Sequence, residues 1–152
     1  MELKELYQEI ILDHGKNPRN KGKCEGFTND AKAHNTLCGD KVHIYLKLNK
    51  DKKIEDLSFE GEGCAISLAS ASILTETVKG KDLSFITRVS DDFINMIKKN
   101  PELKSKILAE DEKTKLMSLS GVKKYPMRVK CATMAWHTLT SAMKNSNTDK
   151  SD

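Results

Sequence analysis

The chain has 152 residues, of which 38% are apolar and 32% are charged, and its formal net charge is +4. This length suits one domain with a buried core, and we expect a single domain over residues 1–144 followed by a flexible polar tail over residues 145–152. The small net charge, with lysines scattered along the chain, gives no indication of a nucleic-acid partner. Because no secretion signal and no run of roughly 20 apolar residues is seen, we expect a cytoplasmic protein that does not contact membranes.

The first predicted element is an amphipathic helix over residues 2–13. Its apolar residues recur at helical spacing: Leu3, Leu6, Tyr7, Ile10 and Ile11. We expect Gly15 and the Asn17–Pro18 pair to end this helix. Residues 16–29 are polar and aperiodic, which is typical of an exposed connecting arm, and we expect Cys24 to be an exposed, incidental thiol there.

Three strands are predicted next. Apolar and polar residues alternate over residues 42–48, which predicts a strand with one buried face. A turn over residues 49–53 follows, the alternation resumes at Leu57 and Phe59, and residues 30–36 form a plausible third strand. A small antiparallel meander of this kind needs helices to cover its apolar face, so the predicted fold class is α+β.

The remaining elements are helical. A helix rich in small residues is predicted over residues 65–79, with Gly80 as its C-terminal cap. A short helix over residues 91–99 ends at Asn100–Pro101, and residues 102–118 are charged and helical or exposed. The last helix begins at Pro126, a residue suited to a first helical position. Its predicted buried stripe comprises Ala132, Ala135, Trp136, Leu139 and Met143, and its methionines are expected in the core.

Three of the four cysteines fall at the ends of predicted elements. Cys38 lies in the glycine-containing stretch NTLCGD before a strand, Cys64 begins a helix, and Cys131 lies in the second turn of the last helix. A disulfide framework is not expected in a reducing compartment. Element ends can converge on one edge of a domain, so three thiols and Asp40 could form a tetrahedral zinc site. An iron-sulfur cluster suits this set less well, because stable clusters prefer thiolate ligands throughout.

The surroundings of the cysteines favour the thiolate form, which binds metals and attacks sulfur. The backbone N–H groups at a helix N-terminus favour it at Cys64, and Lys130, Arg128 and Lys123 would do so at Cys131 if they face it. The alternative is that each cysteine is a small buried apolar residue, since the spacing is unlike a pair of CxxC motifs.

The histidines are weaker candidates for a metal site. His14, His43 and His137 are expected to be solvated or hydrogen-bonded structural residues. His34 is expected at most to contact a metal ligand, without binding the metal itself.

Four stretches of the sequence resemble one known family: LYQEIILDHGKNPRNKG, NTLCGD, FEGEGCAISLASASILTE and SGVKKYPMRVKCATMAW. They are similar to the U-type iron-sulfur cluster assembly proteins, the family of IscU, SufU and the N-terminal domain of NifU. The resemblance implies a three-stranded antiparallel sheet with helices packed on one side and a metal site at one end. It also implies that Cys38, Asp40, Cys64 and Cys131 are the metal ligands.

Two features in which the chain differs from IscU-like members resemble the SufU branch of that family. Lys130 stands where IscU-like members carry a histidine ligand, and the segment between Cys64 and Cys131 is longer, with its extra residues expected around residues 90–115. The chaperone-recognition motif of IscU-like members is reduced to Tyr125–Met127, which argues against a dedicated chaperone.

Resemblance to SufU implies a Zn²⁺-binding persulfide acceptor, or sulfurtransferase. Its sulfur would come from a SufS-like, pyridoxal-phosphate-dependent cysteine desulfurase, Cys38 would be the acceptor, and downstream iron-sulfur assembly proteins would receive the sulfur. One alternative is a scaffold that binds iron or a labile 2Fe-2S cluster. Another is a purely structural zinc domain that binds partners.

Overall fold

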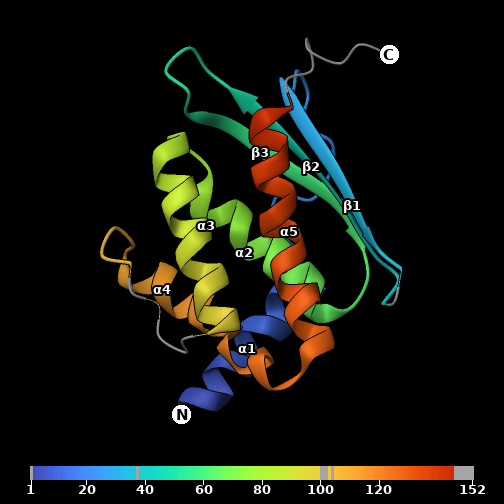
Figure 1. Cartoon of the computed structure of the whole chain (residues 1–152), viewed down its shortest axis with the longest axis vertical. Helices are drawn as coiled ribbons and strands as arrows, with labels where there is room; N and C mark the ends of the chain where they lie inside the picture. Colours follow the sequence, from blue (N-terminus) through green and yellow to red (C-terminus); the bar gives the residue numbers. More distant parts are fainter. Residues whose placement is uncertain (1, 37, 100–102, 104, 146–152) are drawn as a thin grey trace.

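The computed structural model describes residues 2–36, 38–99, 103 and 105–145. Its elements follow one another along the chain as shown in Figure 1. They are α1 (Leu3–Lys16), β1 (Asn29–Asn35), β2 (Asp40–Leu48), β3 (Ile54–Glu62), α2 (Ala65–Val78), α3 (Leu83–Lys98), α4 (Glu110–Met117), the 3-10 helix η1 (Ser120–Lys124) and α5 (Pro126–Lys144).

The three strands form one antiparallel sheet in the order β1-β2-β3. In its register, Ala31 lies opposite Ile44, which in turn lies opposite Phe59. These side chains share the buried face, as period-2 alternation requires. The predicted meander is therefore confirmed. β3 extends beyond Leu57 and Phe59, the two apolar residues from which it was predicted.

Helices cover one face of this sheet (Figure 1). α5 packs against β1 and β2, α2 packs against β3, and α1 and α3 pack outside these two helices. Trp136 of α5 is fully buried and stacks on Phe93 of α3 with ring centroids 4.6 Å apart. The α+β architecture with helices on one side is confirmed.

The segment before β1 is not the exposed arm that its polarity predicted. Gly22 donates its N–H to Phe59 O at 2.7 Å, and Phe59 donates its N–H to Asn20 O at 3.0 Å, so this segment pairs with the outer edge of β3. Cys24 is buried, with 3% of its surface exposed, and its thiol lies 3.5 Å from Asp56 Oδ2. The expectation of an exposed Cys24 was wrong, because backbone pairing folds a polar segment onto the sheet without any apolar periodicity.

Two helix boundaries also differ from the prediction. Gly15 does not end α1, which continues to Lys16; a Cβ at position 15 would lie 3.3 Å from the Cβ of Ala65, so the glycine allows α1 to approach α2 closely. The helix expected over residues 91–99 begins at Leu83, where the Asp82 side chain accepts the N–H of Phe85 and caps it. Helical structure within residues 102–118 is confined to α4 in the described part.

The last helix begins at Pro126 as predicted, and its small residues and Trp136 are buried. Met143 is half-buried, and Met127 is 55% exposed, so not every methionine of this helix is in the core. Asn100–Pro101 and the tail from residue 146 onward lie outside the described residues.

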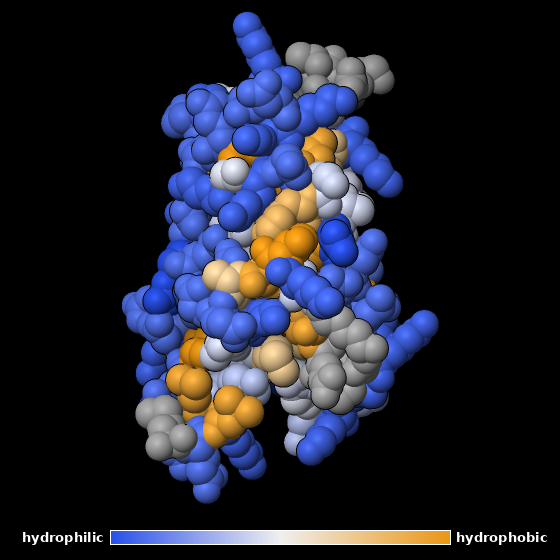
Figure 2. Space-filling view, turned by 90° about the vertical axis from the view of Figure 1, so that its left-hand side faces the viewer, coloured by the Kyte–Doolittle hydropathy of each residue, from blue (hydrophilic) through white to orange (hydrophobic). Residues whose placement is uncertain are grey.

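The side of the molecule that carries α3 and α4 is mostly hydrophilic (Figure 2). Apolar side chains appear on it in a band that runs from the upper part through the centre, and again at the lower end. Among the described residues, no helix has the length and apolar character needed to cross a bilayer.

Candidate metal centre

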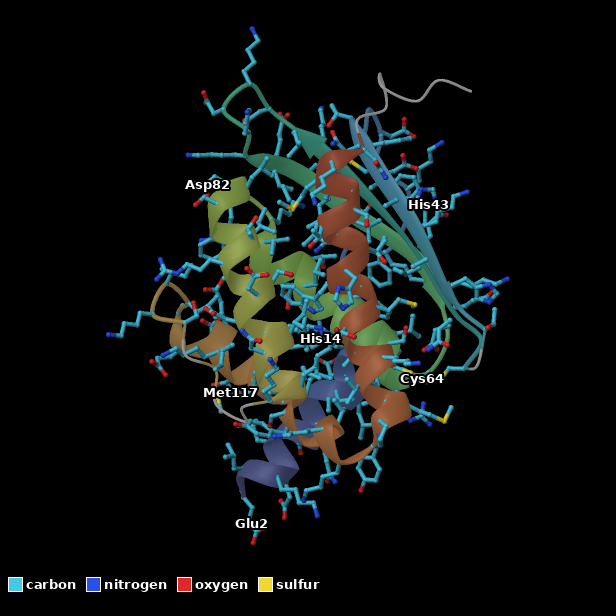
Figure 3. All side chains as sticks on the ribbon, viewed as in Figure 1. Glu2, His14, His43, Cys64, Asp82 and Met117 are labelled. Carbon is cyan, nitrogen blue, oxygen red and sulfur yellow. The ribbon has the colours of Figure 1, made fainter. Side chains whose placement is uncertain are left out.

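The three predicted cysteine ligands and Asp40 come from four points of the chain that meet at one end of the sheet. Cys38 lies in the turn between β1 and β2, and Asp40 is the first residue of β2. Cys64 is the N-cap of α2, at the lower end of α5 in Figure 3, and Cys131 lies in the second turn of α5. The chain folds so that the β1–β2 turn and two helix starts face one another.

A compact group of possible ligand atoms results. The sulfurs of Cys38 and Cys131 and a carboxylate oxygen of Asp40 all lie within 4.8 Å of one another. In the part of the chain that the model describes, this is the one group of three such residues close enough to share a metal ion. Two thiols and one carboxylate at this spacing match most of a tetrahedral zinc shell.

Cys64 lies beside this group and also caps a helix. Its sulfur accepts the N–H of Ser67 at 3.5 Å, a contact that fixes the side chain at the start of α2. The Cys64 thiol is near enough to Cys131 to contribute to the raised pKa of that residue. Cys64 is therefore the candidate for the third sulfur of the site.

Asp40 carries the clearest sign that the site suits a cation. The residue is fully buried, and its Oδ1 accepts the backbone N–H of Cys64 at 3.0 Å. Its Oδ2 is also buried and has no hydrogen-bond partner among the described residues. A buried carboxylate oxygen without a partner is costly, so the site fits a cation that binds there.

Gly63 makes room for this carboxylate. Its φ is +148°, and a Cβ at this position would clash with the Asp40 carboxylate, lying 2.9 Å from its Cγ. Gly63 therefore admits the Asp40 carboxylate at close range. No sequence pattern reveals this relationship, because it joins residues 23 positions apart on two elements.

Cys131 is the most enclosed thiol of the group, with 1% of its surface exposed. Burial raises the pKa of its thiol well above the usual range, and the neighbouring Asp40 carboxylate and the Cys38 and Cys64 thiols raise it further. This end of the sheet therefore favours a protonated Cys131, contrary to the expectation that nearby cations favour its thiolate, because burial outweighs them. A metal ion would have to displace that proton, as it does at other thiolate sites.

Arg128 is the cation that reaches the cysteines. It lies one turn before Cys131 on α5, and its interaction with Cys131, followed by the charge of Cys64, raises the pKa of its guanidinium. Lys130 and His34 are exposed and, within the described chain, lie outside the ligand group. Lys123 points elsewhere, since its ammonium donates to Lys99 O at 2.7 Å.

His14 and His43 have structural partners. His14 is 2% exposed, and its Nδ1 lies 2.7 Å from Ser72 Oγ. His43 Nε2 lies 2.7 Å from Asp30 Oδ2 on the outer face of the sheet. Cys24 is not one of the residues of the metal group. Burial and the nearby Asp56 raise the pKa of its thiol to about 11.

Comparison with known proteins agrees with this geometry. Residues 6–132 match the family model described as the NifU-like N-terminal domain. The chain belongs to that family. The resemblance inferred from the four sequence stretches is thereby confirmed.

Curated members of the NifU-like family are similar along most of the chain. The zinc-dependent sulfurtransferase SufU of Bacillus subtilis is 42% identical over 137 residues, covering 88% of this chain and 86% of its own. The iron-sulfur cluster assembly scaffold protein IscU of Thermotoga maritima is 37% identical over 145 residues, covering 95% of this chain and 96% of its own. The Bacillus relative is thus named for zinc-dependent sulfur transfer, and the Thermotoga relative for iron-sulfur cluster assembly.

A solved structure shows the same fold. It is assigned as an iron-sulfur cluster assembly scaffold protein for the SUF system from Fervidobacterium islandicum, is 34% identical and has a TM-score of 0.76. The match covers 91% of this chain and 97% of that one.

Proposed function

We propose that this protein is a zinc-dependent sulfur acceptor of iron-sulfur cluster assembly, which takes persulfide sulfur from a SufS-like, pyridoxal-phosphate-dependent cysteine desulfurase in the cytoplasm. The observation that carries the proposal is the meeting of Cys38, Asp40 and Cys131 within 4.8 Å, beside Cys64. The name of the Bacillus relative, a zinc-dependent sulfurtransferase, supports the same assignment.

Cys38, Asp40, Cys64 and Cys131 would hold the zinc ion. The fit rests on the donor set of three sulfurs and one oxygen and on the buried Asp40 Oδ2 without a partner. Zinc bound there supplies the positive charge that keeps the thiols deprotonated. Arg128 adds a second positive charge next to Cys131 and Cys64.

Cys38 is the proposed acceptor because of its place in the chain. It is half-buried in a turn next to Gly39, whose φ is +71°, whereas Cys131 is buried within α5 and Cys64 caps α2. The turn allows the Cys38 side chain to swing outward without unwinding a helix.

The transfer itself is a thiol exchange. The Cys38 thiolate attacks the terminal sulfur of the desulfurase persulfide and forms a new S–S bond. The old S–S bond breaks, and the desulfurase cysteine leaves as a thiolate. Downstream assembly proteins would then receive this sulfur.

The second candidate is a scaffold on which an iron-sulfur cluster is built. Relatives named IscU scaffold proteins favour it, including the one from Streptococcus pyogenes at 38% identity over 144 residues. Two features weigh against it: Asp40 is a hard oxygen donor at a site for soft metals, and the residue before Cys131 is the exposed Lys130, which is a poor soft-metal ligand.

One experiment separates these functions from a purely structural zinc domain. The protein is purified without oxygen, its metal content is measured, and turnover of a SufS-like desulfurase is followed with and without it. We expect about one zinc per chain and faster turnover. A cluster that transfers to an apo-acceptor would instead support the scaffold, and zinc without any effect on turnover would support the structural domain.

A further inference from the structure

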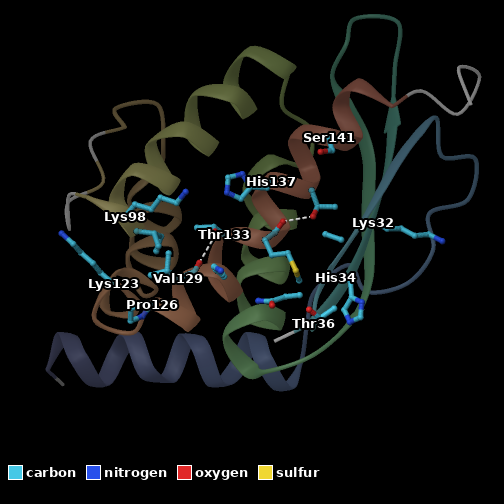
Figure 4. A pocket seen from close by; sticks show the side chains of 16 residues that line it. Lys32, His34, Thr36, Lys98, Lys123, Pro126, Val129, Thr133, His137 and Ser141 are labelled. Carbon is cyan, nitrogen blue, oxygen red and sulfur yellow. Dashed lines mark hydrogen bonds between the residues drawn. The ribbon is translucent and has the colours of Figure 1, made fainter. Parts of the chain in front are cut away.

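A second feature of the molecule is a groove of about 810 Å³ along the outside of α5. In Figure 4 it runs between β1 with the turn after it, which carry His34 and Thr36, and the ends of α3 and η1, which carry Lys98 and Lys123. Its floor is one stripe of α5 that extends from Pro126 to Ser141. At 1.5 Å per helical residue the stripe is about 22 Å long, which is the length of about seven residues of extended peptide.

Beside this groove the edge of β1 is open at Lys32 and His34, whereas the N–H of Asp30 on the same edge donates to Asn145 O at 3.4 Å. The backbone groups of Phe59 in β3 hydrogen-bond to residues 20 and 22, on the side away from β2. Ile44 of β2, which lies opposite Phe59, therefore directs its backbone hydrogen bonds to Ala31 of β1. By alternation, the main-chain groups of Lys32 and His34 point away from β2. Among the described residues neither of these N–H groups has a backbone partner, whereas the outer edge of β3 is paired.

The charge of the groove has one sign. Lys32, Lys98, Lys123 and Lys130 line it, and no aspartate or glutamate among the described residues does. None of these four lysines forms an ion pair with a described residue, in contrast to Lys41, which pairs with Glu62. The positive charge of Lys98 also contributes, after burial, to the lowered pKa of His137 in the same groove.

We propose that this groove binds an extended acidic segment of a protein partner, which adds to the sheet as a fourth strand against β1. The main chain of the segment pairs with Lys32 and His34, and its carboxylates face the lysines of the rim. A single-stranded nucleic acid is disfavoured because no phenylalanine, tyrosine or tryptophan lines the groove to stack on its bases. The proposal goes beyond sulfur acceptance and does not depend on it.

The position of the groove gives the interaction a use. Its lower end is formed by Thr36, Pro126 and Lys130, which lie within one to five residues of Cys38 or Cys131 in sequence. A partner strand docked there ends beside the metal centre. The groove would thus select partners by an acidic strand and hold them next to the reactive cysteines.

The test uses the full-length zinc-loaded protein and a fluorescein-labelled peptide of about eight residues in which valine and glutamate alternate. Binding is followed by fluorescence anisotropy at low salt. The comparison probes are the same peptide with lysine for glutamate, the same peptide N-methylated at alternate residues, and an oligothymidylate of similar length. We expect only the first probe to bind, and its binding to weaken as salt rises.

Matched variants locate the site. Lys98→Glu with Lys123→Glu should weaken peptide binding about tenfold, and Lys50→Glu with Lys106→Glu, an equal charge change at exposed positions elsewhere, should not. Lys32→Pro removes the outward N–H and should abolish binding, while Lys32→Ala should retain most of it.

The proposal is overturned if the acidic peptide fails to bind, if the N-methylated peptide binds equally well, or if the oligothymidylate binds as tightly. It is also overturned if the Lys98 and Lys123 changes have no more effect than the control pair. Zinc content is measured for every variant, so that loss of peptide binding with an intact metal centre is distinguished from failure of the sulfur-acceptor function.

Discussion

The buried carboxylate of Asp40 fills the volume that a side chain at Gly63 would occupy. The same carboxylate accepts the N–H of Cys64, the next residue, so β2 and the start of α2 are locked together at the metal centre. The position of Asp40 is therefore set before any metal binds.

Gly63→Ala should disturb both the backbone and the carboxylate. With φ at +148° and Asp40 in contact, we expect a loss of about 1–3 kcal/mol in the free energy of unfolding and weaker zinc binding in competition with a chelator. Gly121→Ala is the matched control, because nothing lies within 4 Å of the added Cβ. Equal zinc affinity in the two variants would show that Gly63 does not position Asp40.

Ser70→Ala should destabilise the helical layer that carries the cysteines. Ser70 Oγ accepts the indole N–H of Trp136 at 3.2 Å and donates to Ala132 O at 2.5 Å, all within the core. The alanine leaves a buried N–H without a partner, which costs about 1–3 kcal/mol. Urea unfolding measures this loss, and Ser84→Ala at an exposed position of α3 should change stability by less than about 0.5 kcal/mol. A neutral effect at Ser70 would contradict the role of this hydrogen bond.

Stability should fall as the pH is lowered below the ordinary pKa of histidine, about 6.5. Burial lowers the pKa of His14 in the folded state, so the unfolded chain takes up the proton at a higher pH. This protonation stabilises the unfolded chain relative to the folded one. The loss grows as pH falls from the unfolded pKa toward the lower folded one and is absent above neutral pH. His137 has the same sign. Urea unfolding at pH 7.5 and 5.5 should therefore show a smaller pH dependence in His14→Asn than in the wild type; an unchanged dependence would contradict this.

Zinc removal should expose thiols in a definite order. Cys38 and Cys64 are half-buried, while Cys131 and Cys24 are almost fully buried. In the metal-free protein, a thiol reagent should modify Cys38 and Cys64 first, and added zinc should protect both. Cys24→Ala should leave the fast phase unchanged. Rapid modification of Cys24, or no protection by zinc, would contradict the assignment of the centre.

Much of the fold was predictable because its signals are local. Alternation over residues 42–48 and the first-turn proline at Pro126 located a strand and a helix without tertiary information. The edge pairing of Gly22 with Phe59 and the burial of Cys24 were missed, since backbone hydrogen bonds between distant segments leave no periodicity. The start of α3 was missed although the capping residue Asp82 marks it.

The candidate site shows the same division. The positions of Cys38, Cys64 and Cys131 at element ends could be read from the sequence, and so could the choice of Asp40 as their neighbour. The interaction of Arg128 with Cys131 and Cys64 follows from helical spacing only once α5 is placed beside α2. The fit of Asp40 to Gly63 required the packed structure.

The most direct test of the central claim is the location of sulfur after reaction with a desulfurase and cysteine. Intact and peptide mass spectrometry are applied to the wild type, Cys38→Ala and Cys24→Ala after loading. We predict one additional sulfur on Cys38 in the wild type and in Cys24→Ala, and none in Cys38→Ala, with the fold of the variant checked by circular dichroism. Sulfur that still loads on folded Cys38→Ala would contradict the assignment of Cys38 as the acceptor.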